Sequence, residues 1–235
     1  GEAAEEYSGS WVAGAGVVNV DGYDDLLVGA PDNDEGGNGA GQTYLMLGKA
    51  TGWALGTSLS AADASFIGED AGDDSGGSVA AVGDVNGDGY DDFVIGAPRE
   101  VGRTYLVLGK ASGWAMDTSL SAANASFIGE RADGNSGERV AGVGDVNGDN
   151  YDDVLVGACT YGADPIEGAG AVFLFLVSAG GLSPAAAPLT GPRPANDRNR
   201  DRRLARIRQR RGPRRRPSVR LSAIRGPPAR LVAAA

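Results

Sequence analysis

The sequence predicts an all-β protein, and three observations support this prediction. Glycine is very frequent, with 39 of 235 residues, whereas aromatic residues make up only 6%, a composition that suits tight turns and short strands better than helices. Apolar runs of four to six residues alternate with Gly, Pro and Asp, which indicates strands. A segment of roughly 60 residues occurs three times, which indicates a repeat architecture.

Each of the three copies begins with a Ser-Gly pair. They read SGSWVAGAGVVNVDGYDDLLVGAP, SGGSVAAVGDVNGDGYDDFVIGAP and SGERVAGVGDVNGDNYDDVLVGAC, and they start at residues 8, 75 and 136. The similarity continues downstream, because residues 41–69 match residues 102–130 at nearly every position. The chain therefore divides into an N-terminal segment (1–7), three repeats (8–74, 75–135 and 136–190) and a C-terminal tail (191–235).

Each repeat is expected to form four short strands. In the second copy we expect them near Val79–Val82, Phe93–Ile95, Thr104–Leu108 and Ala125–Ile128. Four antiparallel strands in a repeat of this length are typical of one blade of a β-propeller. The alternative is a β-sandwich with similar hairpins, but sandwich strands need not repeat in sequence at a fixed interval. The prediction is therefore three four-stranded antiparallel propeller blades.

A loop rich in Asp and Asn follows the first strand of each copy, and in the second copy it reads DVNGDGYDD over residues 84–92. Oxygen-bearing side chains occupy loop positions 1, 3, 5 and 9, and position 7 can offer its backbone carbonyl. Calcium takes about six to eight oxygen ligands, some of them carboxylates, so the loop predicts a Ca²⁺ site. The expected ligands in the second and third copies are Asp84, Asn86, Asp88, Tyr90, Asp92, Asp145, Asn147, Asp149, Tyr151 and Asp153.

The first copy departs from this pattern, because Val17 replaces the first Asp. A weaker site is expected there, with Asn19, Asp21, Tyr23 and Asp25 as the remaining candidates.

Position 6 of the loop needs a positive φ, and it is Gly22, Gly89 or Asn150, residue types that tolerate this conformation. An EF-hand would need a Glu at position 12, where this chain has an apolar residue. The remaining alternative is that Asp-Gly only forms a hairpin turn.

At these residues the chain resembles the FG-GAP repeat family, which forms the β-propeller of integrin α subunits and of many microbial surface proteins. The resemblance rests on the calcium loop and on Gly-Ala-Pro at 29–31 and 96–98, and it covers about 170 residues. The third copy has Gly-Ala-Cys at 157–159, and Ser-Gly replaces the family's Phe-Gly pair. The resemblance implies a non-enzymatic, Ca²⁺-stabilised propeller that is extracellular or on the cell surface and serves adhesion, display or assembly.

Three blades are too few to close a propeller, which needs at least about four. Either further blades complete the ring or several chains assemble. The partner implied by the resemblance is a protein or a glycan, and a carbohydrate-processing or carbohydrate-binding propeller is the alternative function. Trp53 and Trp114 occupy matching loop positions, where packing between blades is expected rather than stacking on sugars.

The charge is divided between two unlike parts of the chain. Residues 191–235 contain fifteen Arg and two Asp, whereas residues 1–190 contain 6 Lys/Arg and 29 Asp/Glu. An acidic body repels nucleic acid and attracts cations, and no apolar run is long enough to span a membrane.

Three interpretations of the tail stay open. It is a disordered Arg/Pro-rich segment, a nucleic-acid-binding or anion-binding segment around 206–211, or a frameshifted fourth repeat. The third interpretation arises because Arg codons read one base out of frame can encode Asp and Gly. Over residues 207–214 these Asp and Gly residues would fall at the positions that they occupy in the other loops, one repeat further along the chain.

Overall fold

The computed structural model describes residues 6–129, 134–161, 170–179, 183–184 and 189–190, and these residues form an all-β fold. Helical structure in this part of the chain is limited to two 3-10 turns of three residues each, η1 (Leu59–Ala61) and η2 (Leu120–Ala122). No helix among the described residues has the length and apolar character needed to cross a membrane. The predicted basic tail lies outside the described residues.

Three sheets contain all the strands of the described residues. The first two sheets have the strand orders β1-β2-β3-β4 and β5-β6-β7-β9, and neighbouring strands within these two series are antiparallel. The strands of the first sheet are β1 (Trp11–Gly16), β2 (Asp25–Ala30), β3 (Gln42–Met46) and β4 (Ala64–Ile67). Those of the second are β5 (Ser78–Gly83), β6 (Asp92–Ala97), β7 (Arg103–Val107) and β9 (Ala125–Ile128).

The third sheet contains three longer strands, β10 (Ser136–Gly144), β11 (Asp153–Ala158) and β12 (Ala171–Leu176). The place of its fourth strand is taken by two segments of two residues each, β13 (Ser183–Pro184) and β14 (Leu189–Thr190), which both pair with β12. We refer to the three sheets as blades 1, 2 and 3. The four strands predicted for the second copy are confirmed, since they overlap β5, β6, β7 and β9.

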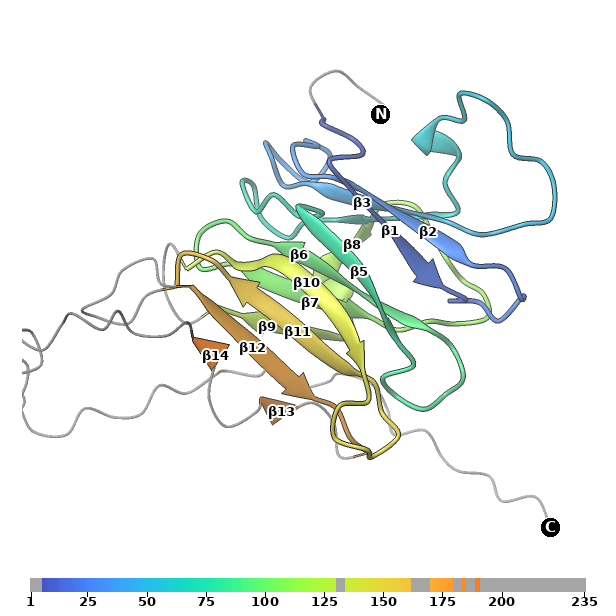
Figure 1. The fold of residues 1–235 in the computed structure, drawn as a ribbon. Helices are drawn as coiled ribbons and strands as arrows, with labels where there is room; N and C mark the ends of the chain where they lie inside the picture. Colours follow the sequence, from blue (N-terminus) through green and yellow to red (C-terminus); the bar gives the residue numbers. More distant parts are fainter. Residues whose placement is uncertain (1–5, 130–133, 162–169, 180–182, 185–188, 191–235) are drawn as a thin grey trace, which may run out of the picture.

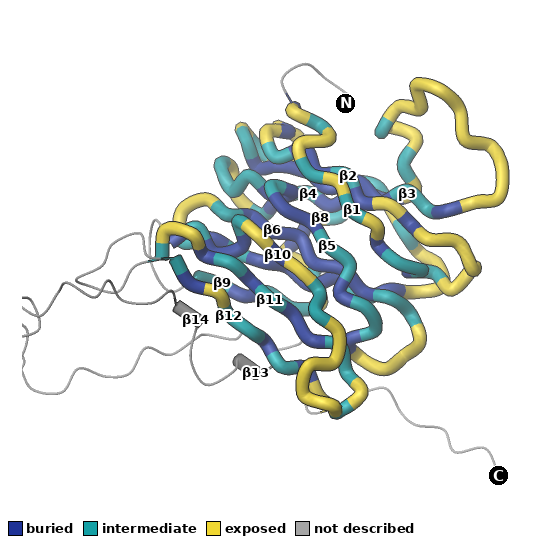
Figure 2. The backbone as a smooth tube through the Cα atoms, in the orientation of Figure 1, coloured by how far each residue is buried: buried dark blue, intermediate teal, exposed yellow. Residues whose placement is uncertain are grey.

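The blades stack face to face, with β5 packed between β1 and β10 (Figure 1). One apolar core lies between blades 1 and 2, where Leu27, Leu45 and Phe93 are buried. A second core lies between blades 2 and 3, where Val94, Leu106 and Val154 are buried. Figure 2 shows buried residues, in dark blue, along the strands of all three blades. The stability of the stack therefore comes from contacts between blades as well as within them.

One segment of the second repeat crosses to the preceding blade. The two-residue strand β8 (Thr118–Ser119) pairs in parallel with β4, where Phe66 lies opposite Thr118. The stretch that leads to it, residues 108–117, runs over the edge of blade 1, and its Trp114 packs against Phe66 and Phe93. The expectation that Trp114 packs between blades is confirmed.

Candidate calcium-binding loops

The three Asp/Asn-rich loops are the hairpins that join the first strand of each blade to the second. They run between β1 and β2, between β5 and β6, and between β10 and β11, and they lie along the same edge of the stack (Figure 1). A β-bulge precedes each loop, and the glycine at that bulge has φ of 74°, 69° and 68° at Gly16, Gly83 and Gly144, respectively. The bulge turns the chain out of the strand and into the loop.

The first Asp of the second and third loops holds the turn through backbone N–H groups. Asp84 Oδ1 accepts from the N–H of Gly87 at 2.7 Å, and Asp84 Oδ2 accepts from the N–H of Gly89 at 2.7 Å. The same Oδ1 also accepts from the N–H groups of Asn86 and Asp88 at 3.3 and 3.1 Å. The loop thereby curls around this one carboxylate.

Asp145 repeats this pattern in the third loop. Its carboxylate accepts from the N–H groups of Gly148 and Asn150 at 2.6 and 2.7 Å. These bonds stabilise the charged form, so the pKa of Asp145 lies below its usual value, with the bond from Asn150 as the largest cause. Val17 in the first loop offers no side-chain oxygen, so that loop lacks this contact.

Positions 3 and 5 are linked side chain to side chain in all three loops. Asn86 Nδ2 donates to Asp88 Oδ2 at 2.8 Å, and the equivalent pairs are Asn19 with Asp21 at 2.9 Å and Asn147 with Asp149 at 3.2 Å. The position-5 Asp also accepts from the N–H of the Tyr at position 7, at 2.9 Å for Tyr23, 3.0 Å for Tyr90 and 3.1 Å for Tyr151. The loops therefore share one conformation. The expected positive φ at position 6 is confirmed, with 86°, 90° and 70° at Gly22, Gly89 and Asn150.

Position 9 differs from the others because its carboxylate is buried. Asp92 Oδ2 accepts from the N–H of Val85 at 2.9 Å, and Oδ1 accepts from the N–H of Gly109 at 2.7 Å. Asp25 and Asp153 make the same two contacts with their own blades. Each position-9 carboxylate thus ties the start of the loop to the end of the third strand.

Burial changes the acidity of this group. The pKa of Asp92 is raised to about 7, chiefly by burial and further by the nearby charges of Asp88 and Asp84, while the two N–H bonds oppose the rise. Burial also raises the pKa of Asp25. The effect of Asp84 and Asp88 on Asp92 means that three carboxylates of one loop repel one another.

The oxygen chemistry of these loops fits a hard divalent cation, because each complete loop presents three carboxylates and one amide. Within the residues that the structure describes, however, no group of three or more His, Cys, Asp and Glu side chains is gathered as a metal cluster. The loop carboxylates instead accept backbone and amide N–H groups. The assignment of these residues as Ca²⁺ ligands stays a prediction.

Sequence reasoning missed the role of position 8, where each copy has an Asp directly before the buried one. Asp91 Oδ2 accepts from the N–H of Val17 at 2.8 Å, so an acid of the second loop holds the start of the first loop. Asp152 of the third loop lies against Gly83 at the start of the second loop, as Asp91 lies against Gly16. Its pKa is raised by burial and then by Asp145 and Asp84. The signal was the Tyr-Asp-Asp triplet present in all three copies.

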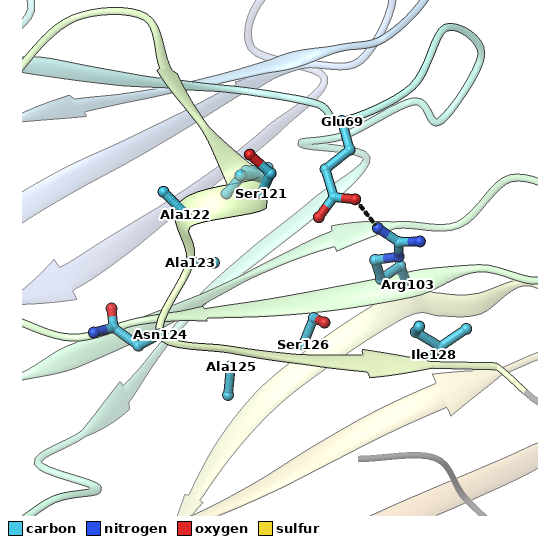
Figure 3. A pocket seen from close by; sticks show the side chains of 10 residues that line it. Glu69, Arg103, Ser121, Ala122, Ala123, Asn124, Ala125, Ser126 and Ile128 are labelled. Atoms are coloured by element: carbon cyan, nitrogen blue, oxygen red, sulfur yellow. Dashed lines mark hydrogen bonds and ion pairs between the residues drawn. The ribbon is translucent and has the colours of Figure 1, made fainter. Parts of the chain in front are cut away.

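A separate cavity of about 490 Å³ lies beside η2 and β9 (Figure 3). Its charged groups are Glu69 and Arg103, which form an ion pair, and Arg103 also donates to the Tyr105 hydroxyl at 3.3 Å. Glycoside hydrolysis typically needs two carboxylates, whereas Glu69 is the only acid among the described residues that line this cavity. The cavity therefore does not favour the carbohydrate-processing alternative.

A family model described as the FG-GAP repeat matches the chain at residues 9–46, 75–107 and 136–175. The chain is 32% identical to integrin alpha pat-2 of Caenorhabditis briggsae over 170 residues, which cover 65% of this chain and 13% of that protein. It is 32% identical to integrin alpha-3 of Cricetulus griseus over 156 residues, which cover 65% of this chain and 14% of that protein. It is 33% identical to integrin alpha-PS2 of Drosophila melanogaster over 160 residues, which cover 63% of this chain and 11% of that protein. The matched region is thus a small part of each relative.

Proposed function

The chain is an FG-GAP repeat protein, and from this premise we propose that it is a calcium-stabilised extracellular β-propeller module for adhesion, surface display or assembly. Ca²⁺ is the proposed cofactor, and the cell surface or extracellular space is the proposed location. A protein or a glycan is the proposed ligand. The similarity to integrin alpha chains supports an adhesion-type propeller.

The observation that carries the proposal is the shared geometry of the three loops. Asp84, Asn86 and Asp88 lie within one turn, and the pKa of Asp92 is raised chiefly by burial and further by the charges of Asp88 and Asp84. A divalent cation in this turn would offset the repulsion and favour the ionised form of all three carboxylates. Asp145, Asn147, Asp149 and Asp153 repeat the arrangement in blade 3. The ion would then link the two ends of each hairpin and stabilise the blade.

Calcium dependence of stability tests the proposal. Extracellular calcium modules bind with Kd of about 10⁻⁴–10⁻³ M, and at ten times Kd each site adds about 1.4 kcal/mol. With two complete loops, thermal unfolding of the full chain in Ca²⁺ should shift upward by about 5–10 °C relative to excess EDTA. The double variant Asp88→Asn, Asp149→Asn should lose this shift, because each substitution removes one ligand charge.

The matched control is Asp70→Asn, which removes the same charge from an exposed position outside the loops. It should keep the full calcium response. Asp21→Asn in the first loop should change the response less than Asp88→Asn, since Val17 already weakens that site. An equal melting temperature in Ca²⁺ and EDTA, in a chain that unfolds cooperatively, would mean that the loops are only hairpin turns.

A further inference from the structure

We propose that the cavity beside η2 and β9 binds an extended acidic peptide of a partner protein, and that Arg103 holds the Asp carboxylate of this peptide. The template for the ligand is part of the chain itself, because residues 115–119 bind at the equivalent place on blade 1. All the described residues that line the cavity belong to the first two repeats. None of them lies in the Asp/Asn-rich loops, so the inference does not depend on the proposed calcium sites.

On blade 1, an Asp of the second repeat occupies the equivalent place. Asp117 Oδ1 accepts hydrogen bonds from Gln42 Nε2 and from the Ser65 hydroxyl, both at 3.0 Å. The N–H of Asp117 donates to the same hydroxyl at 2.7 Å. Both Gln42 and Ser65 are buried. The fold therefore already contains one polar pocket of this kind with a carboxylate in place.

The residues around Asp117 also pair with blade 1 through their backbone. The N–H of Ser65 donates to the carbonyl of Ala115 at 3.2 Å, and β8 pairs in parallel with β4, with Thr118 opposite Phe66. The segment thus adds a short strand to the edge of a sheet, which is a common way in which proteins bind extended peptides. Backbone pairing aligns the segment, and the Asp side chain anchors it.

Blade 2 repeats this framework with one change of charge. Ser126 takes the position of Ser65 in the repeat, and Arg103 takes the position of Gln42. The register of β9 on β7 is the same as that of β4 on β3. A guanidinium in place of an amide suits a carboxylate better, because it adds a positive charge and can donate two parallel N–H bonds.

The equivalent position of blade 2 faces the cavity of about 490 Å³ (Figure 3). Arg103, Ser126 and Ile128 line the cavity from β7 and β9, and Ser121 lines it from η2. Pockets for small ligands measure about 300–1,000 Å³. The cavity therefore has room for a few residues of a peptide but not for a folded domain.

The third repeat cannot supply the Asp that the second repeat gives to blade 1. Seventeen residues lie between Gly109 and Phe127, whereas eleven lie between Val177 and Leu189, which hold the same positions in blade 3. These eleven residues, 178–188, include neither Asp nor Glu. Within this segment, β13 pairs with β12 of its own blade. We therefore assign the occupant to another protein.

Glu69 holds Arg103 in the cavity when no peptide is bound. The two side chains form an ion pair, and Arg103 also donates to the Tyr105 hydroxyl at 3.3 Å. Among the described residues, both bonds come from Nη1 of Arg103. Its Nε and Nη2 can therefore donate to a second carboxylate. Because Glu69 repels an incoming anion, removal of its charge should strengthen binding of the peptide.

Titration of the full chain with a labelled peptide tests the proposal. The probe is a fluorescent peptide of residues 112–120, Ser-Gly-Trp-Ala-Met-Asp-Thr-Ser-Leu, and binding is measured by fluorescence anisotropy in a buffer that contains Ca²⁺. Replacing the Asp of the peptide by Asn should weaken binding by more than about tenfold, since a hydrogen bond between charged groups is lost. Added salt should also weaken binding, because it screens the same attraction.

Variants of the chain locate the site. Arg103→Ala should abolish binding, and Arg103→Gln should retain part of it, because Gln is the residue that blade 1 uses. Glu69→Gln should tighten binding by about threefold. Arg99→Ala is the matched control, because Arg99 also pairs with an acid, Asp74, but is not among the described residues that line the cavity. It should leave the affinity unchanged. Circular dichroism checks that each variant is folded.

Three results would overturn the proposal. A wild-type chain that does not bind the peptide at millimolar concentration has no site for an acidic segment of this kind. Equal affinity for the Asp and Asn peptides means that the carboxylate is not recognised. Unchanged affinity in Arg103→Ala places the peptide elsewhere, for instance on blade 1 in exchange for residues 115–119. None of these results affects the calcium shift of the melting temperature, so the two proposals can fail separately.

Discussion

The Asp91 carboxylate accepts a hydrogen bond from the backbone N–H of Val17 at 2.8 Å, and this bond joins the Asp/Asn-rich loops of two blades. Nearby, the N–H of Lys110 donates to the carbonyl of Val18 at 2.8 Å. The start of the first loop is therefore held by blade 2 as well as by Asp25 of its own blade. The loops stabilise the stack of blades through these contacts even without an ion.

Replacing Asp91 by Ala should destabilise the chain by about 1.5–3 kcal/mol, the usual contribution of a hydrogen bond to a charged group. Asp24→Ala is the matched control, because Asp24 has the same loop position but is exposed on blade 1. It should change stability by less than about 0.5 kcal/mol. Urea unfolding measures both variants at a protein concentration at which the chain is monomeric. Equal losses would show that the acid stabilises its own loop and not the neighbouring blade.

Glycine at the bulge offers a second test of the contact between blades. Gly83 and Gly144 have nearly equal φ, 69° and 68°, so replacement by Ala causes the same backbone strain of about 1–2 kcal/mol at both sites. A Cβ at Gly83 would also overlap the Asp152 carboxylate, whereas at Gly144 the nearest atom among the described residues is Asp152 Oδ1, at 4.0 Å. We expect Gly83→Ala to cost about 1–3 kcal/mol more than Gly144→Ala.

Unfolding of the two glycine variants in the same denaturant series gives this difference directly. Because both substitutions cause the same backbone strain, the difference between the two free energies of unfolding reports only the overlap with Asp152. If the two alanine variants have the same stability, then Asp152 moves away without cost and the loops of blades 2 and 3 are not packed together.

The strands could be predicted from the sequence because their signals are local. Short apolar runs between Gly, Pro and Asp located the four strands of blade 2, and the need for positive φ located the turn residues Gly22, Gly89 and Asn150. Both signals depend on backbone sterics and on burial of alternate side chains, which act within a few residues.

The environment of each repeat could not be predicted, because nearly the same sequence occurs in different surroundings. Trp53 and Trp114 lie in almost identical segments, yet one is half-exposed and the other packs on Phe66. Burial of Asp92 was missed for a similar reason. The spacing of oxygen-bearing side chains predicted Asp92 as a metal ligand. Only the fold shows that the N–H groups of Val85 and Gly109 both donate to its carboxylate.

The apolar contacts between blades lead to a third prediction. Val79→Ala removes two methyl groups from the core between blades 1 and 2 and should cost about 1–3 kcal/mol. Val12→Ala makes the same change at the equivalent, exposed position of blade 1 and should cost less than about 0.5 kcal/mol in the monomer. Differential scanning calorimetry of the two variants measures the contrast. Similar losses would mean that Val12 is packed against other residues in solution.

The buried Asp92 predicts how stability depends on pH in the absence of calcium. Its pKa rises from an ordinary value of 3.8 to about 7 on folding, mainly through burial. Between these two values the folded chain binds more protons at this site than the unfolded chain, so its free energy of unfolding decreases as the pH rises from about 4 to about 7. Each pKa unit corresponds to about 1.4 kcal/mol, which sets an upper limit of about 4 kcal/mol for this site.

Urea unfolding in EDTA at several pH values measures this slope, and Asp92→Asn should flatten it because the amide does not titrate. Asp70→Asn, on the exposed surface, should leave the slope unchanged. Added Ca²⁺ should also reduce the slope, since an ion among Asp84, Asp88 and Asp92 lowers the pKa of the buried carboxyl toward its usual range. A slope that is the same in wild type and in Asp92→Asn would show that folding does not raise the pKa of Asp92. In that case its two backbone N–H bonds would offset the effect of burial.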